Sequence, residues 1–343
     1  GSGVVVGLIH PRSVEDWTEW ERSRHRVRAV KAAVVRRVRP PIPPSLVLHQ
    51  RGDDPSVLVA LDVPRGTSVD ALLAPLAHYA GSAAVLTRGP IPAGMLPGTW
   101  SSEPLAHLSA LPSTIRRVLS AGAFESVSLP VHGWARDRGV EFVVVQHGLL
   151  TPFAPPLPEA SHLLAWSEAD AAFWAEGRPD VATSTVGPQL LWRAAQRPLS
   201  TNSDRAVFLG QLHGVELPRL DVARVSSRFC RMTHAEYRPH PGERDVVSRA
   251  LHEVWRRTGV EFEASGLPLA ELARPVVSIF STGILEAAAQ GRPAWGVHPE
   301  PSTWLLEVWA RYGVGRWGGE PTLAPVELEA EEPARVIARL LTT

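Results

Sequence analysis

The chain has 343 residues, more than the roughly 100 to 200 of a typical domain, and this length predicts two domains. Hydrophobic residues make up 44% and charged residues 20%, a composition that allows a sizeable core and excludes bulk disorder. Because 35 Lys and Arg balance 35 Asp and Glu, the net charge is zero, which argues against a protein that collects nucleic acid through its overall charge.

Cysteine usage and hydropathy bear on the compartment. Cys230 is the single cysteine, so an intramolecular disulfide and a cysteine-based zinc cluster are both excluded. No apolar run approaches the roughly 18 residues that span a bilayer, and the first residues lack the basic segment of a signal peptide. We therefore expect a cytoplasmic protein.

A basic helix is predicted near the start of the chain, at 13–39. Ser13 and Asp16 resemble a capping pair at the start of this helix. Apolar residues recur at helical spacing after them, and Pro40 ends this pattern. Residues 22–39 are rich in arginine, which a solvated helix face explains. The alternative is contact with an anionic acceptor or with the inner face of a membrane, since basic residues are attracted to acidic lipid.

In the first half of the chain, short strands of the buried type alternate with helices. This pattern is typical of a parallel α/β sheet with helices on both faces. Strands are predicted at 4–9, 46–49, 57–63, 83–87, 141–146, 162–166 and 182–186. Helices are predicted at 69–79, 113–121 and 168–176.

A polar segment rich in helix and strand breakers, 194–205, separates this region from a second series and is the predicted linker. The second series has predicted strands at 206–209, 229–237, 260–263, 276–280 and 294–297, and helices at 243–257 and 283–290. The sequence thus predicts two doubly wound, Rossmann-like domains facing a cleft. Their expected bounds are 4–195 and 205–325, followed by a C-terminal helix at 326–343 that can pack back on the first domain.

Residues that follow predicted strands are the candidates for chemistry, because ligands of parallel α/β sheets bind beyond the carboxyl ends of the strands. Ser281, Thr282 and Gly283 follow one strand and open a helix. Backbone N–H groups, two hydroxyls and the positive end of the helix dipole can meet one phosphate there. Glu286, about one turn further, can accept hydrogen bonds from ribose hydroxyls. As structure alone, Ser281 is a good helix N-cap.

A second group follows the strand predicted at 229–237. It contains Arg238, His240 and Arg244, and Pro241 is suited to the first position of the next helix. His240 and either arginine can then face the same phosphate as the hydroxyls after the neighbouring strand. An exposed capping histidine is the alternative interpretation.

In the first domain, His147 follows the strand at 141–146 and precedes a glycine that permits a tight turn. An imidazole with a pKa near 6.5 can take a proton from an acceptor hydroxyl at neutral pH. We therefore predict that His147 projects into the cleft as a general base. The alternative is a structural histidine satisfied by a backbone carbonyl.

Two weaker signals concern a glycine and the tryptophans. Gly210, after the strand at 206–209, permits close approach of the backbone to a phosphate or simply marks a turn. Trp166, Trp174 and Trp192 flank the predicted cleft and are either core residues or stacking surfaces for a sugar.

These motifs resemble those of a known group of enzymes. A strand, Ser281-Thr282-Gly283, Glu286 and then Gly291-Arg292-Pro293 resembles the nucleotide-binding half of GT-B glycosyltransferases. Together with His240-Pro241, the Ser-Thr pair resembles the paired motifs of bacterial sialyl- and polysialyltransferases that use CMP-sugars. By this resemblance His240, Ser281 and Thr282 hold the donor's phosphate.

The segment around His147 adds a second resemblance. His147-Gly148 is similar to the His-Gly of CDP-glycerol glycerophosphotransferases, whose His-Pro region the chain also resembles. The family's histidine is taken as catalytic base, and this role carries over to His147. Two departures are visible: Leu149-Leu150 separate His-Gly from Thr-Pro, and Asp53-Asp54-Pro55 stands in place of an acidic-acidic-Gly motif.

These observations converge on a metal-independent, inverting glycosyltransferase or polyol-phosphate transferase. Its donor is expected to be CMP- or CDP-linked and its acceptor a hydroxyl of an envelope or secondary-metabolite glycan. The sequence contains no Asp-x-Asp and no P-loop, so neither a metal nor a further cofactor is expected. One alternative is a nucleotide-sugar 2-epimerase, although residues 147–158 hold none of the acidic groups it needs. The other is a non-catalytic GT-B-like scaffold.

Overall fold

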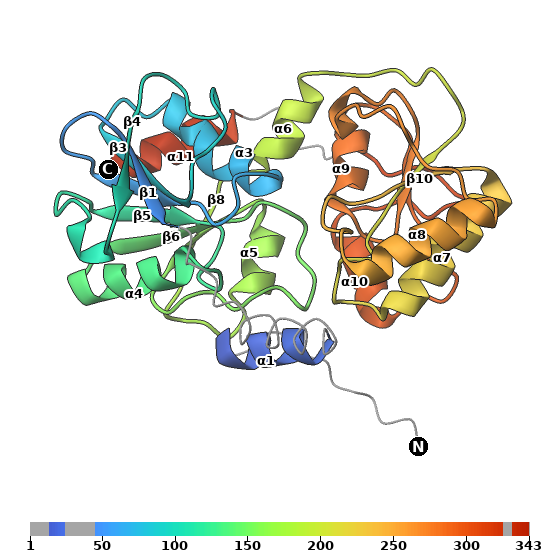
Figure 1. Cartoon of the computed structure of the whole chain (residues 1–343), viewed down its shortest axis with the longest axis horizontal. Helices are drawn as coiled ribbons and strands as arrows, with labels where there is room; N and C mark the ends of the chain where they lie inside the picture. The colour runs from blue at the N-terminus through green and yellow to red at the C-terminus, as the bar shows by residue number, and fades with distance from the viewer. Residues whose placement is uncertain (1–13, 25–44, 325–330, 343) are drawn as a thin grey trace. The chain divides into compact units, whose positions relative to one another are not determined.

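A computed structural model describes residues 14–24, 45–324 and 331–342 (Figure 1). These residues form two compact units: unit 1 is drawn from Gly1–Leu190 and Ala330–Thr343, and unit 2 from Leu191–Glu329. The strand expected at 4–9 and the basic residues 25–39 lie outside the described residues, as do the side chains of Arg22 and Arg24. Within the described ranges, no helix is long and apolar enough to cross a membrane.

Unit 1 contains an eight-stranded sheet in the order β4-β1-β3-β2-β5-β6-β7-β8. Its strands are β1 (Leu46–Arg51), β2 (Val57–Ala60), β3 (Ala83–Arg88), β4 (Ser101–Leu105), β5 (Arg117–Ser120), β6 (Glu141–Val145), β7 (His162–Ala165) and β8 (Ala182–Thr185). Pairing is parallel from β3 to β8, as expected. β1 pairs antiparallel with β3 and β4, so the expectation of a wholly parallel sheet was wrong at this end. Pro104 fits the exposed edge strand β4, because proline has no N–H to donate.

Alternating side chains give this sheet an apolar core on each face. Leu58 and Ala60 of β2 belong to the core that also contains α4 and α5, whereas Val57 and Val59 belong to the core with α3, η1 and α11. Unit 1 is therefore doubly wound, as predicted. Its helices are α1 (Val14–Arg24), α3 (Thr67–Leu73), η1 (Ala74–Ala77), η2 (Leu108–Ala110), α4 (Ser128–Arg138), α5 (Glu168–Trp174) and α11 (Pro333–Thr342), and α6 (Gln189–Ala195) spans the sequence boundary between the units.

Helix α1 packs on unit 1 through two aromatic side chains. Trp17 Nε1 donates a hydrogen bond to the carbonyl of Phe153 (2.9 Å), and the Trp20 ring stacks on the Phe153 ring with centroids 5.0 Å apart. The start of the helix expected at 13–39 is thus present, and its continuation past Arg24 lies outside the described residues.

Unit 2 contains a four-stranded parallel sheet in the order β10-β9-β11-β12. Phe208 of β9 contacts Phe229 of α7, and Tyr237 of β10 contacts Trp255 of α8, so both helices cover one face. Leu209 alternates to the opposite face, where it meets α9. The elements are β9 (Val207–Leu209), α7 (Arg219–Thr233), β10 (Glu236–Arg238), α8 (Val246–Arg257), η3 (Leu269–Glu271), β11 (Val276–Ser278), α9 (Thr282–Ala289), β12 (Ala294–Gly296) and α10 (Thr303–Arg311).

Three predicted elements differ from the structure, and one of them, the strand expected at 260–263, is reduced to a single bridge between Phe262 and Tyr237. The segment 113–121 was expected to be a helix, yet it carries β5, because the spacing of Ile115, Val118 and Leu119 imitates a helical stripe in a short buried strand. The strand expected at 229–237 is mostly the end of α7. That helix stops at His234, whose positive φ of 55° breaks the helix before β10 begins.

Each sheet has one point where successive connections leave in opposite directions. In unit 1, β3 and β5 lie on either side of β2; in unit 2, β10 and β11 lie on either side of β9. Doubly wound sheets bind ligands at the carboxyl ends of the strands at such a switch point. The ends of β2 and β5 and the ends of β9 and β11 are therefore the places to examine.

Candidate functional site

At the switch point of unit 2, a glutamine joins the ends of the two strands. Ser278 Oγ, at the end of β11, donates to Gln211 Oε1 (3.0 Å) and to the carbonyl of Leu209 (2.9 Å), and the backbone N–H of Phe280 also donates to Gln211 Oε1 (3.0 Å). Gln211 was not identified from the sequence. The rule applied elsewhere, that polar residues after a strand are candidates, would have found it.

Helix α9 begins at this crevice, as the sequence predicted. Ser281 is its N-cap, and its Oγ accepts a hydrogen bond from the N–H of Gly283 (3.1 Å). Thr282 is the first helical residue, and the first turn holds no acidic side chain. A Cβ at Gly283 would lie 2.5 Å from Leu209 Cδ1, so the glycine lets α9 pack on β9. The positive end of the helix dipole is thus capped by a neutral hydroxyl.

Glu286 lies one turn into α9 and is half-buried. Its charge partly offsets the effect of burial, which lowers the pKa of Arg292. Arg292 is 1% exposed and donates to the carbonyls of Leu269 and Leu272 and to Gln290 Oε1. The arginine of the Gly-Arg-Pro motif therefore anchors the segment before β11 to the end of α9.

The loop after β10 places His240 against a second histidine. The rings of His213 and His240 are stacked, with centroids 3.6 Å apart and planes 10° apart. His240 Nδ1 accepts a hydrogen bond from the N–H of Gly242 (3.0 Å). Burial lowers the pKa of His240, and the charge of Glu243 partly offsets this. Pro241 does not start the next helix, because α8 begins at Val246 with Asp245 as its N-cap.

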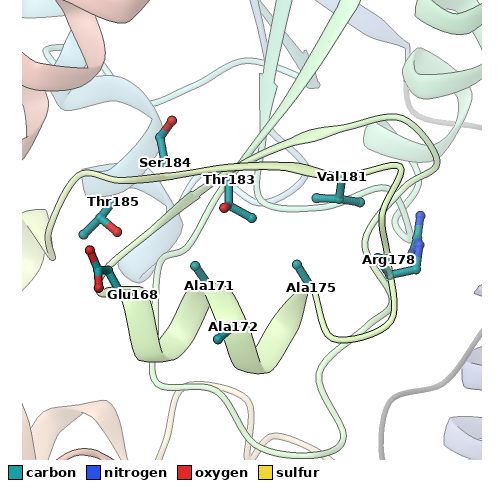
Figure 2. A pocket seen from close by; sticks show the side chains of 9 residues that line it. All are labelled: Glu168, Ala171, Ala172, Ala175, Arg178, Val181, Thr183, Ser184 and Thr185. Carbon is teal, nitrogen blue, oxygen red and sulfur yellow. The ribbon is translucent and has the colours of Figure 1, made fainter.

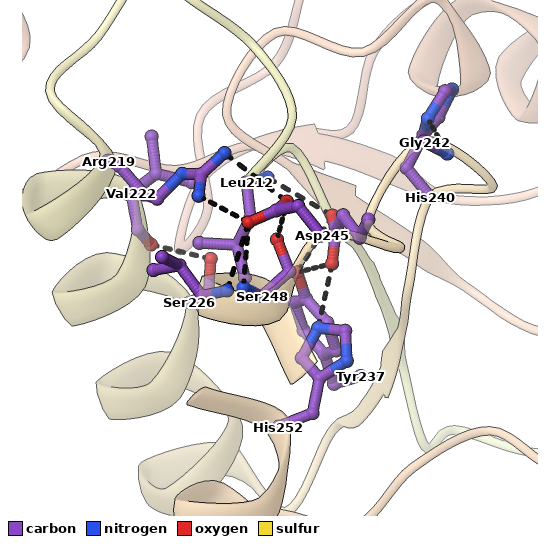
Figure 3. Close-up of polar contacts among 12 residues, drawn as sticks. Leu212, Arg219, Val222, Ser226, Tyr237, His240, Gly242, Asp245, Ser248 and His252 are labelled. Atoms are coloured by element: carbon purple, nitrogen blue, oxygen red, sulfur yellow. Dashed lines mark hydrogen bonds and ion pairs between the residues drawn. The ribbon is translucent and has the colours of Figure 1, made fainter. Parts of the chain in front are cut away.

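Glu243 is the buried centre of this loop, although no role was predicted for it. Its carboxylate accepts from Tyr237 Oη (2.8 Å), from the backbone N–H of Leu212 (3.1 Å) and pairs with His252 Nε2 (2.9 Å). Figure 3 shows Tyr237 and His252 in this cluster, while His240 and Gly242 lie apart on the turn. The side chain of Glu243 is fully buried. It therefore ties the loop after β9 to the loop after β10.

The two predicted arginines differ in their surroundings. Arg238 Nη1 pairs with Glu263 Oε2 (2.8 Å), and its Nη2 donates to the carbonyl of Leu267 (2.7 Å). Arg244 is exposed and makes no ion pair with another residue of the described chain. Of the two guanidinium groups, that of Arg244 is the one free to meet an anion.

Gly210, predicted to let the backbone approach a phosphate or to mark a turn, has a packing role in the structure. A Cβ at this position would overlap Tyr237 Oη and lie 2.5 Å from Glu243 Oε1. Its N–H donates to the carbonyl of Arg238 (2.8 Å). The lack of a side chain is therefore required by the Tyr237–Glu243 cluster.

In unit 1, His147 lies in the turn after β6, two strands from β2. Gln146, which precedes it, is 2% exposed and donates to Asp170 Oδ2 (3.0 Å) and to the carbonyl of Gly148 (3.0 Å), and its Oε1 accepts from the N–H of Trp166 (2.8 Å). Three neighbours thus fix the turn that carries His147.

The His147 imidazole is suited to be neutral at pH 7. Burial lowers its pKa, and a contact with the backbone of Val145 offsets only part of this. Its Nδ1 is buried and has no hydrogen-bond partner within the described part of the chain, so Nε2 is the nitrogen left to meet a substrate. A neutral imidazole carries a lone pair on one nitrogen, and this is the form that accepts a proton.

The switch point of unit 1 is filled by a carboxylate of the protein itself. Asp62, after β2, accepts from the N–H groups of Val127 (2.7 Å) and Ser128 (3.0 Å), which begin α4. The N–H groups that an anion would bind here are already satisfied. This end of unit 1 therefore offers no comparable phosphate site.

The tryptophans near His147 belong to the core. Trp166 and Trp174 are 6% and 8% exposed, and their indole N–H groups donate to the carbonyls of Gln146 (3.0 Å) and Pro155 (2.9 Å). The interpretation of these two rings as sugar-stacking surfaces was therefore wrong.

A hollow of about 640 Å³ lies between α5 and β8 of unit 1 (Figure 2). Ala171 of α5 and Ala175, which follows this helix, form its floor; Thr183 and Thr185 of β8 form its opposite wall, and Glu168 and Arg178 lie at its two ends. None of the predicted site residues lines it. Nowhere in the described ranges do three or more His, Cys, Asp or Glu side chains form a group that could hold a metal ion.

No family model matches the chain, and no curated protein matches it in sequence. Among solved structures it is similar to the UDP-GlcNAc 2-epimerase of Methanocaldococcus jannaschii, with 11% identity and a TM-score of 0.46 over 83% of this chain and 99% of the other. The structure of that enzyme in complex with UDP-GlcNAc and UDP gives 12% identity and a TM-score of 0.45 over 67% and 76% of the two chains. At this identity the likeness concerns the fold alone.

Proposed function

We propose that unit 2 binds the nucleotide of an activated donor and that the protein is a metal-independent, inverting glycosyltransferase or polyol-phosphate transferase. The observation that carries the proposal is the switch point of unit 2. There the N-terminus of α9 is capped by the neutral Ser281, whereas the equivalent helix of unit 1 is capped by the carboxylate of Asp62. An N-terminus without a protein anion favours an external one.

The side chains that follow β10 and β11 suit a phosphate. Ser281 and Thr282 supply hydroxyls, His240 supplies a ring N–H, and Arg244 supplies a positive charge, with Arg238 as a second cation if it leaves Glu263. Hydrogen bonds from such donors strengthen as negative charge builds up on the departing nucleotide, which lowers the barrier. Half-buried Glu286 is the proposed acceptor for the ribose hydroxyls.

His147 is the proposed general base. An acceptor hydroxyl gives its proton to the imidazole while its oxygen forms a bond to the transferred carbon or phosphorus. The bond from that atom to the nucleotide's phosphate oxygen breaks in the same step, and the nucleotide leaves with the electron pair. For a sugar, this single displacement inverts the anomeric centre. The lowered pKa of His147 supports the role, because the ring is unprotonated at neutral pH.

A thermal-shift screen with CMP, CDP, UDP, GDP and ADP tests the donor site. A ligand at 100 times its Kd adds about 2.7 kcal/mol of stability, which is readily measured. We expect CMP or CDP to give the largest shift, in line with the His240-Pro241 and Ser281-Thr282 motifs. A larger shift with UDP or GDP would contradict the cytidine donor and keep the nucleotide site; no shift with any nucleotide would favour a scaffold.

Incubation of a nucleotide sugar without an acceptor separates transfer from epimerisation. A transferase leaves the sugar unchanged apart from slow hydrolysis, whereas a 2-epimerase converts it to its C2 epimer without a second substrate. Proton NMR of the anomeric region distinguishes the two sugars directly.

A further inference from the structure

The stacked histidines of unit 2 come from two different loops. His213 lies between β9 and α7, and His240 lies between β10 and α8. Their rings are nearly parallel at 3.6 Å between centroids. Two imidazoles held face to face cannot both become charged without an anion nearby, because like charges at this distance repel strongly.

The protonation state of one ring follows from its hydrogen bond. His240 Nδ1 accepts from the N–H of Gly242, so the neutral ring carries its proton on Nε2. That nitrogen is a donor on the far side of the ring from the turn. A phosphate oxygen is the acceptor that such a group meets best, since hydrogen bonds to charged acceptors are the stronger ones.

A buried carboxylate fixes the two loops relative to each other. Glu243 accepts from the N–H of Leu212, next to His213 in the chain, and its own N–H donates to the carbonyl of His240 (2.9 Å). Tyr237 Oη and His252 Nε2 complete the shell of the carboxylate. Glu243 thus bonds to the residue that precedes His213 through its carboxylate and to His240 itself through its backbone N–H.

The fit beneath the rings is tight. A Cβ on Gly242 would lie 3.1 Å from His240 Nδ1 and 3.2 Å from both Cβ and Cγ of His213. A side chain at this position would therefore press on both histidines at once. The pair is a built element with a defined geometry.

We propose that His213 is a second histidine ligand for the phosphate of the donor, acting with the stacked His240, and that Glu243 is the positioning residue for both rings. The proposal rests on the nucleotide-binding function of unit 2. It adds a ligand that no sequence motif identified, and it gives a reason for burying a carboxylate directly below the loop.

The first test compares His213→Phe with wild type by titration with CMP. Phenylalanine keeps a ring that can stack on His240 but has no nitrogen, so the expected result is a Kd for CMP on the order of 10-fold or more weaker. Cytidine, which lacks the phosphate, should bind both proteins alike. His107→Phe, an exposed histidine of unit 1, is the matched control and should leave the Kd unchanged. A His213→Phe protein that binds CMP as wild type does overturns the proposal.

The second test addresses Glu243 through the NMR signals of the imidazoles at fixed pH 7. Inorganic phosphate should shift the ring resonances of both His213 and His240 in wild type. In Glu243→Ala, both rings should lose the upfield shift that stacking produces, and the response to phosphate should fall on both together. Glu243→Gln keeps an oxygen for the Leu212 N–H and should restore the shifts and most of the CMP affinity.

The outcomes separate this proposal from the function on which it rests. If phosphate shifts both histidines while no nucleotide binds, the anion site stands and the donor function fails. If CMP binds and His213→Phe has no effect, the donor function stands and the role of His213 fails. If Glu243→Ala does not fold, the Gln variant decides: stacking shifts and CMP affinity that are both kept in Glu243→Gln support positioning through the hydrogen bond to the Leu212 N–H, whereas loss of either in folded Glu243→Gln overturns it.

Discussion

The switch point of each unit consists of two neighbouring parallel strands and the helix that follows one of them, but the group that caps this helix differs between the units. In unit 1, Asp62 places a carboxylate on the N–H groups that begin α4. In unit 2, Ser281 places a hydroxyl at the start of α9, and two histidines stack in the loops after β9 and β10. A helix end that is neutralised within the chain serves stability, whereas one that is capped without charge keeps its attraction for a ligand. A single capping residue thus separates the edge of unit 1, whose helix is capped by a carboxylate, from the edge of unit 2 that we propose as the binding site.

The largest expected effect concerns the one reactive group that we assign to unit 1. His147→Ala should lower the rate of nucleotide release from a productive donor and acceptor pair by about 100- to 10,000-fold, because general base catalysis contributes that much. The Kd for CMP should not change, since the binding edge is in unit 2. Rates are measured by chromatography of the released nucleotide, with His107→Ala as control. Loss of CMP binding with His147→Ala would contradict this division of roles.

Ser281→Asp replaces the neutral cap of α9 with a carboxylate, the kind of cap that Asp62 provides for α4. The carboxylate should stabilise the helix by about 0.3–1 kcal/mol and weaken CMP binding by roughly 10- to 100-fold through repulsion of the phosphate. Ser281→Asn has the same shape without the charge and is the matched control. Calorimetry gives both quantities. Equal CMP affinity of the Asp and Asn variants would show that no phosphate lies at this helix end.

Gly210→Ala tests the packing behind the binding edge. Its Cβ would collide with Tyr237 and Glu243, and overpacking of this kind costs about 1–3 kcal/mol. Gly133, in the middle of α4, has open space around its Cβ position, so Gly133→Ala should instead stabilise by about 0.5–1 kcal/mol. Urea unfolding measures both. The same sign for the two variants would refute this account of Gly210.

Asp62→Asn removes the charge from the cap of α4 and leaves its shape. We expect a loss of about 1–2 kcal/mol in the free energy of unfolding, because two backbone N–H groups lose a charged acceptor. Exposed Asp137, which pairs with its neighbour Arg136, provides the control, and Asp137→Asn should change little. If the two variants were equally stable, the cap would be structurally unimportant.

The smallest expected effect is a dependence of the free energy of unfolding on pH. Burial lowers the pKa of His49, whose ring nitrogens meet Ser102 Oγ (2.7 Å) and Thr87 Oγ1 (3.1 Å), and burial also lowers the pKa of His132 and His147. The unfolded chain therefore takes up protons first as the pH falls below about 6.5, and stability decreases from there downward. Urea unfolding of wild type and His49→Gln at pH 7.5 and 5.5 measures this, and the variant should lose less stability than wild type between the two pH values. A larger loss in the variant would contradict the direction assigned to the pKa of His49.

Elements that can be recognised from their own residues were predicted from the sequence. Contacts between loops that follow different strands were not. The strands around Val57, Ala83 and Glu141 are short apolar runs covered on both faces, so their residue types identify them. Ser281 was found because a cap lies next to its own helix. The strand at 117–120 was misread because a strand of four residues, three of them buried, is too short to show a period of two.

The histidine stack shows the limit of such reasoning. His213 and His240 meet because Glu243 reaches back to the N–H of Leu212, a contact between residues 31 positions apart. A single sequence carries no signal for which of several loops share a hydrogen bond. Similarly, Gly210 and Gly283 were linked to phosphate from their position after a strand, whereas their missing side chains are explained by Tyr237 and Leu209.

The path of the chain has a consequence for synthesis. Residues of unit 2 are inserted between the main part of unit 1 and α11, and Ile337, Ala338 and Leu341 of α11 fill the core against Val57 and Val59. On the ribosome, the sheet of unit 1 emerges before α11. Until α11 emerges, the part of that apolar face that α3 and η1 do not cover stays open to solvent or to a chaperone, while unit 2 already has every described strand of its own sheet.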